Sequence, residues 1–231
     1  MPIPASDGRC NLAVLQPALS PDRPDQNLDR VAQQVEALAR SAPLDLVVLP
    51  EMVDGVTEPG PGDDRTAVLA PFLCRLAERC GVNLIGGSAD CPQPAGRPTN
   101  RCLVIDRQGK QVGHYDKRVL FGSERQGRSP GTSAGVFDLD GVRVGVLICG
   151  DLWHPELARE LSGRVDILCV PAKSGVPSQS HARYARTLWQ SLALTRAMEN
   201  GFILAVSDWA AGQHPLHRTE PEAKASAYST S

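Results

Sequence analysis

Short runs of consecutive apolar residues alternate along the chain with stretches in which apolar residues recur at helical spacing. Residues 11–16 and the nearly continuous apolar run 44–49 predict two strands. A helix is predicted between them, because apolar residues recur there with a helical period: Leu28, Val31, Val35 and Leu38. A strand, a helix and a second strand in this order predict a β-α-β unit whose strands are parallel.

Two later pairs of apolar runs flank turn sequences and predict antiparallel hairpins. Residues 102–106 and 111–115 flank a short polar turn that contains a glycine. Residues 136–139 and 142–149 flank Asp140-Gly141, a dipeptide that suits the type I′ turn of tight hairpins. Antiparallel pairs are therefore expected beside the parallel ones.

The rest of the chain continues this alternation of helices and strands. The remaining predicted elements are helices over 66–80, 155–161 and 182–199, and strands over 82–85, 167–170 and 202–206. Residues 91–100 are rich in Pro, Gly and Arg and predict a loop. Because parallel crossovers and hairpins both occur, we expect an α/β domain with mixed sheets whose faces are covered by helices.

Composition and charge narrow the class of protein. The chain has 231 residues, 42% of them apolar, and a formal net charge of -2. That length fits one compact domain, expected over 1–212, followed by a polar, flexible tail over 213–231. The near-neutral charge gives no electrostatic reason to expect a nucleic acid or an anionic membrane as partner. The chain start does not resemble a secretory signal and no apolar run reaches membrane-spanning length, so a cytoplasmic location is expected.

The cysteines and histidines form no metal or disulfide signature. Seven cysteines, at positions 10, 74, 80, 91, 102, 149 and 169, are scattered without a CxxC pair. An odd count without a secretory signal favours free thiols in a reducing compartment. His214 and His217 are close in sequence, but no further ligand is near them. We therefore expect no metal, and the lack of phosphate- or dinucleotide-binding motifs predicts no cofactor.

Three chemically capable residues follow predicted strands, at positions where loops commonly form sites. Glu51 follows an apolar run and a proline, and Lys117 follows a tyrosine and an aspartate. Taken alone, each is more typical of a solvated surface charge. Cys149 ends an apolar run and precedes Gly150 at a predicted strand-to-helix junction. This setting is similar to the nucleophile turns of other hydrolases, where backbone N–H groups that follow the nucleophile donate to an oxyanion.

Taken in chain order, these segments resemble the motifs of the nitrilase, or carbon–nitrogen hydrolase, superfamily. The central matches are Leu49-Pro50-Glu51, Tyr115-Asp116-Lys117 and Leu147-Ile148-Cys149-Gly150-Asp151. Flanking matches are residues 120–124, Ser129-Pro130-Gly131, residues 154–159 and Arg196-Ala197-Met198-Glu199-Asn200. The resemblance extends from about residue 12 to residue 207. Each short match is weak, but their common order is specific.

The resemblance implies an α-β-β-α sandwich of two mixed sheets flanked by helices. It also implies that Cys149 is the nucleophile, Glu51 the general acid/base and Lys117 the group that stabilises the oxyanion. Glu124 would orient Lys117 or the nitrogen group of the substrate, and the N–H of Gly150 would donate to the oxyanion. Since a neutral thiol is a poor nucleophile, such a site needs a base or a positive field beside Cys149.

The residues after the nucleophile favour an amidase. Relatives that hydrolyse nitriles carry Cys-Trp-Glu, whereas Cys149-Gly150-Asp151 resembles the amide and carbamoyl hydrolases. The expected reaction is hydrolysis of a small amide or N-carbamoyl substrate through a thioester on Cys149. Two alternatives remain open at this point: an acyltransferase that uses the same acyl-enzyme, and a catalytically weak relative that acts as a binding or assembly partner.

The chain departs from the family pattern in two places. Gly150 stands where relatives carry a larger side chain, which predicts a wider pocket or a looser local turn. After residue 207 the chain has no counterpart of the family's further strands, so we expect the last strands of the sandwich to be missing.

Relatives pair through helices corresponding to 155–161 and 182–199, so a homodimer or higher homo-oligomer is expected. The apolar residues expected at this contact are Leu157, Leu161, Leu188, Leu192 and Leu194.

Overall fold

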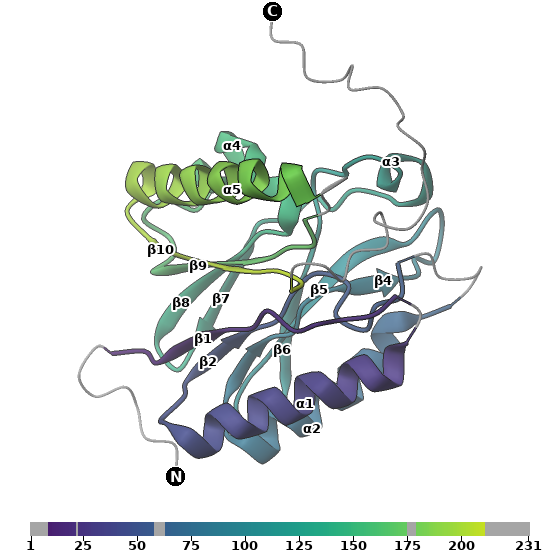
Figure 1. The fold of residues 1–231 in the computed structure, drawn as a ribbon, viewed down its shortest axis with the longest axis vertical. Coiled ribbons are helices and arrows are strands. Elements are labelled where there is room, and N and C mark those ends of the chain that lie inside the picture. The colour runs from purple at the N-terminus through teal and green to yellow at the C-terminus, as the bar shows by residue number, and fades with distance from the viewer. Residues whose placement is uncertain (1–8, 22, 58–62, 175–178, 211–231) are drawn as a thin grey trace, which may run out of the picture.

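The computed structural model describes residues 9–21, 23–57, 63–174 and 179–210. In this part of the chain, two β-sheets lie face to face between two layers of helices (Figure 1). Helices α1 (Pro24–Ser41) and α2 (Arg65–Cys80) cover the outer face of one sheet. Helices α4 (Pro155–Glu160) and α5 (Gln179–Asn200) cover the outer face of the other. The expected sandwich of two mixed sheets flanked by helices is confirmed.

The first sheet has six strands. Its order is β1 (Leu12–Val14), β2 (Leu46–Val48), β3 (Asn83–Ile85), β5 (Thr99–Ile105) and β4 (Ala89–Cys91), with β6 (Gln111–Asp116) also paired to β5. Strands β1, β2 and β3 are parallel, whereas β5 is antiparallel to β3, β4 and β6. The predicted β-α-β unit and the first predicted hairpin are therefore confirmed.

The second sheet has four strands. Its order is β10 (Ile203–Ser207), β9 (Ile167–Pro171), β8 (Val142–Val146) and β7 (Gly135–Leu139). Strands β7 and β8 form the second predicted hairpin, and the other neighbours are parallel. At its turn, Asp140 has a φ of 56° and Gly141 a φ of 83°, so both residues have the positive φ that a type I′ turn requires.

Side chains of the central strands alternate between two apolar cores. In β2, Leu46 and Val48 lie in the core shared with the second sheet, whereas Val47 packs in the core beneath α1 and α2. All three are at most 2% exposed, and burying each such side chain contributes about 1.5–3 kcal/mol to the free energy of folding. Because the strand is anchored on both faces, the residues that follow its end have little freedom to move.

Two expectations about individual segments are wrong, and one strand was not predicted. The unpredicted strand is β4 (Ala89–Cys91), whose apolar pattern is interrupted by the buried carboxylate of Asp90. Leu38, expected on the buried side of α1, is 39% exposed. The strand expected over 142–149 ends at Val146, and the chain turns into a short 3₁₀ helix, η1 (Cys149–Trp153).

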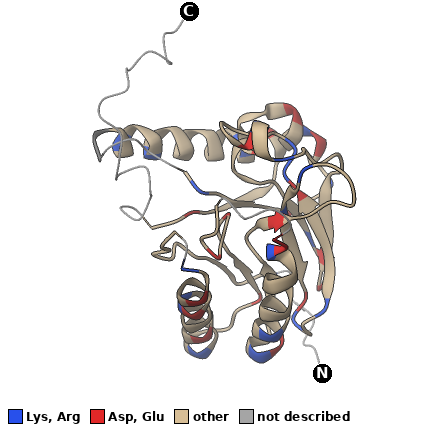
Figure 2. Cartoon of the chain, turned by 90° about the vertical axis from the view of Figure 1, so that its right-hand side faces the viewer, with Lys and Arg blue, Asp and Glu red and all other residues tan. Residues whose placement is uncertain are grey.

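Several sequence-based expectations concern the whole chain rather than one element. The boundary at 212 and the polar stretch 213–231 lie outside the described residues. Within the described ranges, no helix is long and apolar enough to cross a bilayer. In the same ranges, no group of three His, Cys, Asp or Glu side chains is arranged to hold a metal ion. Basic and acidic residues are interspersed along α1 and α2, the helices at the lower end of Figure 2, so these helices present no surface of a single charge.

The outer side of α5 carries exposed apolar side chains. Leu194 is 66% exposed and Met198, one turn later, is 77% exposed, so the two form one apolar patch. Tyr184 on the same helix is 66% exposed. By contrast, Leu157 and Leu161 are at most 7% exposed and belong to the core of this chain, so they are not available for a contact between subunits.

A dimer that buries this apolar patch should be broken by charges on α5. We expect the double variant Leu194→Glu, Met198→Glu to sediment as a monomer where the wild type sediments as a dimer, because an unpaired carboxylate in an apolar contact is costly to bury. Val68→Glu is the control, since Val68 is 50% exposed on α2, in the opposite helical layer. A wild-type chain that sediments as a monomer would contradict the dimer.

Candidate active site

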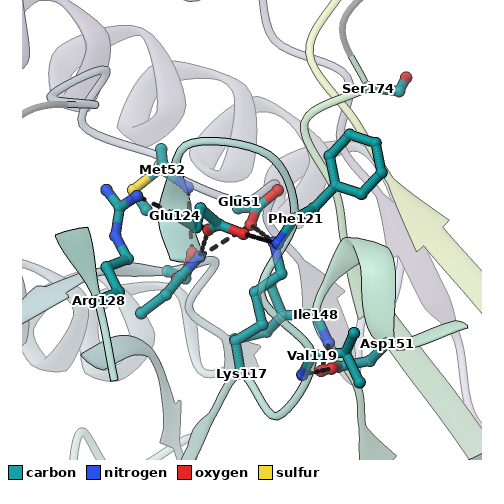
Figure 3. A network of polar contacts seen from close by, with 12 residues as sticks. Glu51, Met52, Lys117, Val119, Phe121, Glu124, Arg128, Ile148, Asp151 and Ser174 are labelled. Carbon is teal, nitrogen blue, oxygen red and sulfur yellow. Dashed lines mark hydrogen bonds and ion pairs between the residues drawn. The ribbon is translucent and has the colours of Figure 1, made fainter. Parts of the chain in front are cut away.

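Lys117 lies between two carboxylates just beyond the end of β6 (Figure 3). Its Nζ is 2.8 Å from Oε1 of Glu51 and 2.7 Å from Oε2 of Glu124. Lys117 is only 2% exposed and Glu51, which follows β2, is 4% exposed. A buried ammonium is costly unless it is paired and hydrogen-bonded, and the two carboxylates meet both requirements. The structure thus brings together three of the residues that the motifs indicated.

Asn100, which sequence analysis did not single out, connects the two carboxylates. Its Nδ2 donates to Oε1 of Glu51 at 2.8 Å and to Oε1 of Glu124 at 3.1 Å. Its backbone carbonyl accepts from the N–H of Lys117 at 2.9 Å. The side-chain Oδ1 of this fully buried residue has no hydrogen-bond partner among the described residues. Buried polar atoms are usually hydrogen-bonded, so the unpaired Oδ1 is unusual. The contribution of this side chain to the network is its two N–H donors.

Two hydrogen-bonding positions in this network are unoccupied. Both bonds to the carboxylate of Glu51 go to Oε1, and within the described part of the chain Oε2 has no partner. A lysine ammonium has three N–H donors, and Lys117 uses two of them on the carboxylates. The open oxygen can accept a proton, and the open N–H can bind a negative charge that develops nearby.

The opposite charges of Lys117 and Glu124 keep each other ionised. Burial alone would lower the pKa of Lys117, but the Glu51 carboxylate, the Cys149 sulfur and the Glu124 carboxylate together raise it above its ordinary value. Burial would raise the pKa of Glu124, but the Lys117 ammonium reverses this and lowers it below the ordinary value. At neutral pH the site therefore contains a protonated lysine and an ionised Glu124.

Cys149 lies at a sharp turn that begins η1. Its φ of 45° is in the left-handed region, which non-glycine residues seldom adopt. Burial raises the pKa of its thiol well above the usual range, the Glu51 carboxylate raises it further, and the Lys117 ammonium opposes them. The next residue, Gly150, lies against Lys117, since a Cβ there would be 3.9 Å from Cε of that lysine, so the partly buried Cys149 lies beside the same network. A thiol with a raised pKa is neutral at rest and needs a base before it can attack a carbon atom.

The carboxylate of Asp151 joins the cysteine turn to the lysine loop. It accepts from the N–H of Ile148 at 2.9 Å, just before Cys149. It also accepts from the N–H of Val119 at 2.7 Å and from the hydroxyl of Tyr115 at 2.8 Å (Figure 3 shows the Ile148 and Val119 bonds). A further bond comes from the N–H of Arg118 at 3.1 Å. One fully buried side chain therefore fixes the distance between the segments that carry Lys117 and Cys149.

The Arg-Ala-Met-Glu-Asn motif holds the other end of η1. The guanidinium of Arg196 donates to the carbonyl of Leu152 at 3.2 Å and to that of Trp153 at 3.5 Å. It also forms an ion pair with Glu199 at 3.1 Å. Arg196 is 8% exposed, so the long helix α5 is fastened to the turn that begins with Cys149. The motif residue acts here by anchoring backbone carbonyls.

A second buried ion pair borders the site. Arg128 contacts both carboxylate oxygens of Asp90, with distances of 2.5 and 2.7 Å, and donates to the carbonyl of Thr57 at 2.9 Å. Another of its guanidinium nitrogens is 3.8 Å from Glu124. The pair supports the network from the side of β4. Neither residue was predicted, because a three-residue strand gives little sequence signal and Arg128 is far from Asp90 in the sequence.

Gly150 lies beside Lys117, at a position where a Cβ would fit with ordinary contacts. A Cβ at this position would lie 3.9 Å from Cε of Lys117 and 3.7 Å from Cβ of Phe121, which are ordinary contact distances. A larger side chain would therefore project between the lysine and Phe121, whose side chain is 62% exposed. The wider pocket or looser turn expected at Gly150 stays a prediction.

Comparison with known proteins identifies the family. Residues 11–221 match the carbon–nitrogen hydrolase family. Because this match covers most of the chain, the protein belongs to the carbon–nitrogen hydrolase family, the superfamily that its motifs resemble. The chain is 28% identical to the 2-oxoglutaramate amidase of Bacillus subtilis, over 84% of this chain and 74% of that relative. It is also 28% identical to omega-amidase NIT2-A of Xenopus laevis, over 85% of this chain and 73% of that relative.

Solved structures agree with the fold. Nit3 of Saccharomyces cerevisiae, a member of branch 10 of the nitrilase superfamily, matches with a TM-score of 0.76 and 25% identity. The match covers 87% of this chain and 76% of that chain. An amidase from Nesterenkonia sp. AN1 matches with a TM-score of 0.73 and 21% identity, over 87% of this chain and 79% of that chain. The arrangement of sheets and helices is therefore the nitrilase fold.

Asp151 should be critical for stability because several donors depend on it. Asp151→Asn keeps the shape but points an amide N–H₂ group at buried donors, and we expect it to lower the free energy of unfolding by about 2–4 kcal/mol. Tyr115→Phe is the matched control, because it removes only one of the same bonds and should cost about 1 kcal/mol. Urea unfolding monitored by circular dichroism measures both. Equal losses in the two variants would show that the backbone bonds to Asp151 contribute little.

The lowered pKa of Glu124 predicts a pH-dependent contribution to stability. Its folded-state pKa lies below the ordinary value of 4.5, so its stabilisation is present above that value and is lost as the pH falls through the lower, folded pKa. The difference in unfolding free energy between wild type and Glu124→Gln should therefore be largest near neutral pH and shrink in acid. Urea titrations of both proteins from pH 7 to about pH 3 measure it. A difference that is constant over this range would contradict the assigned coupling to Lys117.

Proposed function

We propose that the protein hydrolyses the carbon–nitrogen bond of a small, non-peptide amide or N-carbamoyl substrate, with Cys149 as the nucleophile. The observation that carries this proposal is the buried Lys117 ammonium held against Glu51 beside the neutral thiol of Cys149. Membership of the carbon–nitrogen hydrolase family and similarity to relatives named as amidases support the same reaction class.

In the proposed first half-reaction, Glu51 is the general base. Its open oxygen, Oε2, takes the thiol proton while Sγ of Cys149 forms a bond to the carbonyl carbon of the substrate. The free N–H of Lys117 and the backbone N–H of Gly150 bind the resulting oxyanion. When the oxyanion collapses, the carbon–nitrogen bond breaks, and Glu51 returns its proton to the departing nitrogen. The products of this step are ammonia or an amine and a thioester on Cys149.

In the second half-reaction, water replaces the departed amine. Glu51 takes a proton from the water as its oxygen attacks the thioester carbon, and Lys117 again stabilises the oxyanion. Collapse breaks the carbon–sulfur bond, and the proton on Glu51 passes to the leaving sulfur. The acid is released and the neutral thiol is restored. Glu124 takes no proton in this scheme, because it serves to hold and orient Lys117.

The size of each contribution can be estimated. Positioned acid/base catalysis by Glu51 should be worth about 10²–10⁴-fold, and one donor to the oxyanion about 10²–10³-fold. Lys117 combines an N–H donor with a positive charge in a buried setting, where electrostatic interactions are less screened by water. These estimates set what the variants should lose.

Variants of the proposed catalytic residues should lose activity without unfolding. We expect Cys149→Ala to abolish ammonia release from an amide substrate, and Lys117→Ala and Glu51→Gln to lower kcat/KM by at least about 10²-fold. Cys74→Ala is the matched control, since Cys74 is also partly buried and its thiol pKa is also raised by burial, but it lies on α2. Wild-type turnover by Cys149→Ala would overturn the nucleophile assignment.

The intermediate can be sought directly. Intact-protein mass spectrometry after rapid quenching should show the acyl group of an amide substrate added to the wild type and not to Cys149→Ala. Addition of hydroxylamine then separates hydrolysis from acyl transfer, because a transferase would form the hydroxamate in preference to the acid. A chain that gains no mass with any amide or carbamoyl compound in a panel, and releases no ammonia, would favour the non-catalytic alternative.

A further inference from the structure

The segments that follow β9 and β10 lie side by side at the candidate site. The two strands are parallel neighbours in the second sheet (Figure 1), and their pairing ends with Ser207 opposite Pro171. Just beyond this point, the backbone N–H of Ala172 donates to the carbonyl of Ser207 at 2.7 Å. Neither segment continues as a strand after this bond, so what joins them further on depends on other contacts.

The carboxylate of Asp208 makes that connection. It accepts hydrogen bonds from the backbone N–H of Ser174 at 2.9 Å and from the hydroxyl of the same residue. It also accepts from the N–H of Trp209, the residue that follows it, at 2.8 Å. One side chain therefore joins the segment after β9 to the segment after β10, and holds the backbone from which the Trp209 side chain extends.

The two joined segments hold the backbone of Glu51. The N–H of Glu51 donates to the carbonyl of Ala172 at 3.2 Å. The carbonyl of Glu51 accepts from Nε1 of Trp209 at 2.8 Å, and this tryptophan is only 6% exposed. Glu51 follows a strand of the first sheet, yet both of these bonds go to segments that follow strands of the second sheet.

The turn that contains Glu51 needs such support. Met52, the next residue, has a φ of 50°, in the left-handed region that non-glycine residues seldom adopt. A backbone in this conformation persists only where the surrounding structure holds it. The place of the Glu51 carboxylate beside Lys117 therefore depends on the two bonds to its backbone as well as on the bonds to Oε1.

Asp208 carries a cost that its hydrogen bonds must offset. Burial raises the pKa of Asp208, and the bonds from Ser174 and Trp209 oppose only part of this rise. Among the described residues, no lysine or arginine forms an ion pair with this carboxylate, whose partners are the three donors named above. A partly buried carboxylate without a cation is tolerated only if it is hydrogen-bonded. All of these bonds serve the connection between the two segments.

We propose that Asp208 is a positioning residue for Glu51: its carboxylate fastens the segments after β9 and β10 to each other, and these segments hold the backbone of Glu51 in place. The catalytic consequence rests on the proposed function, in which Glu51 is the general base, whereas the fastening itself does not. Asp208 takes no part in proton transfer and acts only through Ser174 and Trp209.

Two substitutions at Asp208 separate its hydrogen bonds from its charge. Asp208→Asn and Asp208→Ala both remove the charge, but an asparagine oxygen can still accept from the N–H groups of Ser174 and Trp209. We expect Asp208→Ala to lower kcat for ammonia release about ten- to hundredfold with little change in KM, because a displacement of about 1 Å can cost on the order of 10²-fold. Asp208→Asn should retain most of kcat. Asp166→Ala is the control, since Asp166 pairs with Arg143 just before β9, at the opposite end of that strand.

A double-mutant cycle shows whether Asp208 acts through Glu51. In a Glu51→Gln background, where the proposed base is already lost, Asp208→Ala should lower the remaining activity no further. An equal loss with and without the Glu51 carboxylate would overturn the positioning role, because Asp208 would then act on another part of the site. Equal kcat in Asp208→Ala and Asp208→Asn would overturn it as well.

Hydrogen exchange tests the fastening without any reaction. By mass spectrometry, the peptide that contains Glu51 and Met52 should exchange about tenfold faster in Asp208→Ala than in Asp208→Asn, because its backbone bonds open more often. Peptides from α1 and α2 should exchange at the same rate in both variants. An unchanged rate at Glu51, or faster exchange throughout the chain, would overturn the proposal. If exchange is faster only around Glu51 and no amide releases ammonia, the amidase proposal fails and the fastening by Asp208 stands.

Discussion

The charge of Lys117 is the constraint on which the rest of the site depends. An ammonium with almost no contact with water is tolerated only if opposite charges and hydrogen bonds replace its hydration. Glu51 and Glu124 supply the charges. Asn100 donates a hydrogen bond to each carboxylate, which offsets part of their mutual repulsion. The ends of β2, β5 and β6 must therefore meet at one place. The two buried cores beneath these strands provide the rigidity that this meeting requires.

Backbone strain is concentrated in the same region. Met52, directly after Glu51, has a φ of 50°, and Cys149 has a φ of 45°, and such residues cost about 1–3 kcal/mol each. Hydrogen bonds from neighbouring segments hold both turns in place. The carboxylate of Asp151 accepts from the N–H of Ile148, just before Cys149, and the indole N–H of Trp209 donates to the backbone carbonyl of Glu51. The fold thus compensates locally for the backbone conformation at Met52 and Cys149, which lie at the proposed catalytic groups.

The sequence predicted the layers and most elements, because apolar periodicity follows directly from which faces are buried. Glu51, Lys117 and Cys149 were indicated together by the resemblance of their ordered motifs to those of the nitrilase superfamily. The sequence did not predict Asn100, whose place beside Lys117 depends on the register of β5 against β6, which no local pattern records. Strand β4 was missed for a related reason, because Asp90 is buried there by pairing with Arg128 from a distant loop. Site residues whose position depends on pairing between distant segments therefore cannot be predicted from local sequence patterns.

The single open oxygen of Glu51 implies an order of events. With Oε1 occupied by Lys117 and Asn100, the proposed base can exchange a proton with only one partner at a time. The departing nitrogen and the incoming nucleophile must then use the same atom in turn, and the second cannot be activated until the first has left. In the proposed reaction, this order requires an acyl-enzyme of finite lifetime. That intermediate can end as a free acid or as a new amide, depending on which small nucleophile reaches the one open oxygen of Glu51 first. The concentration and the basicity of the nucleophiles that enter after the first product leaves decide this competition.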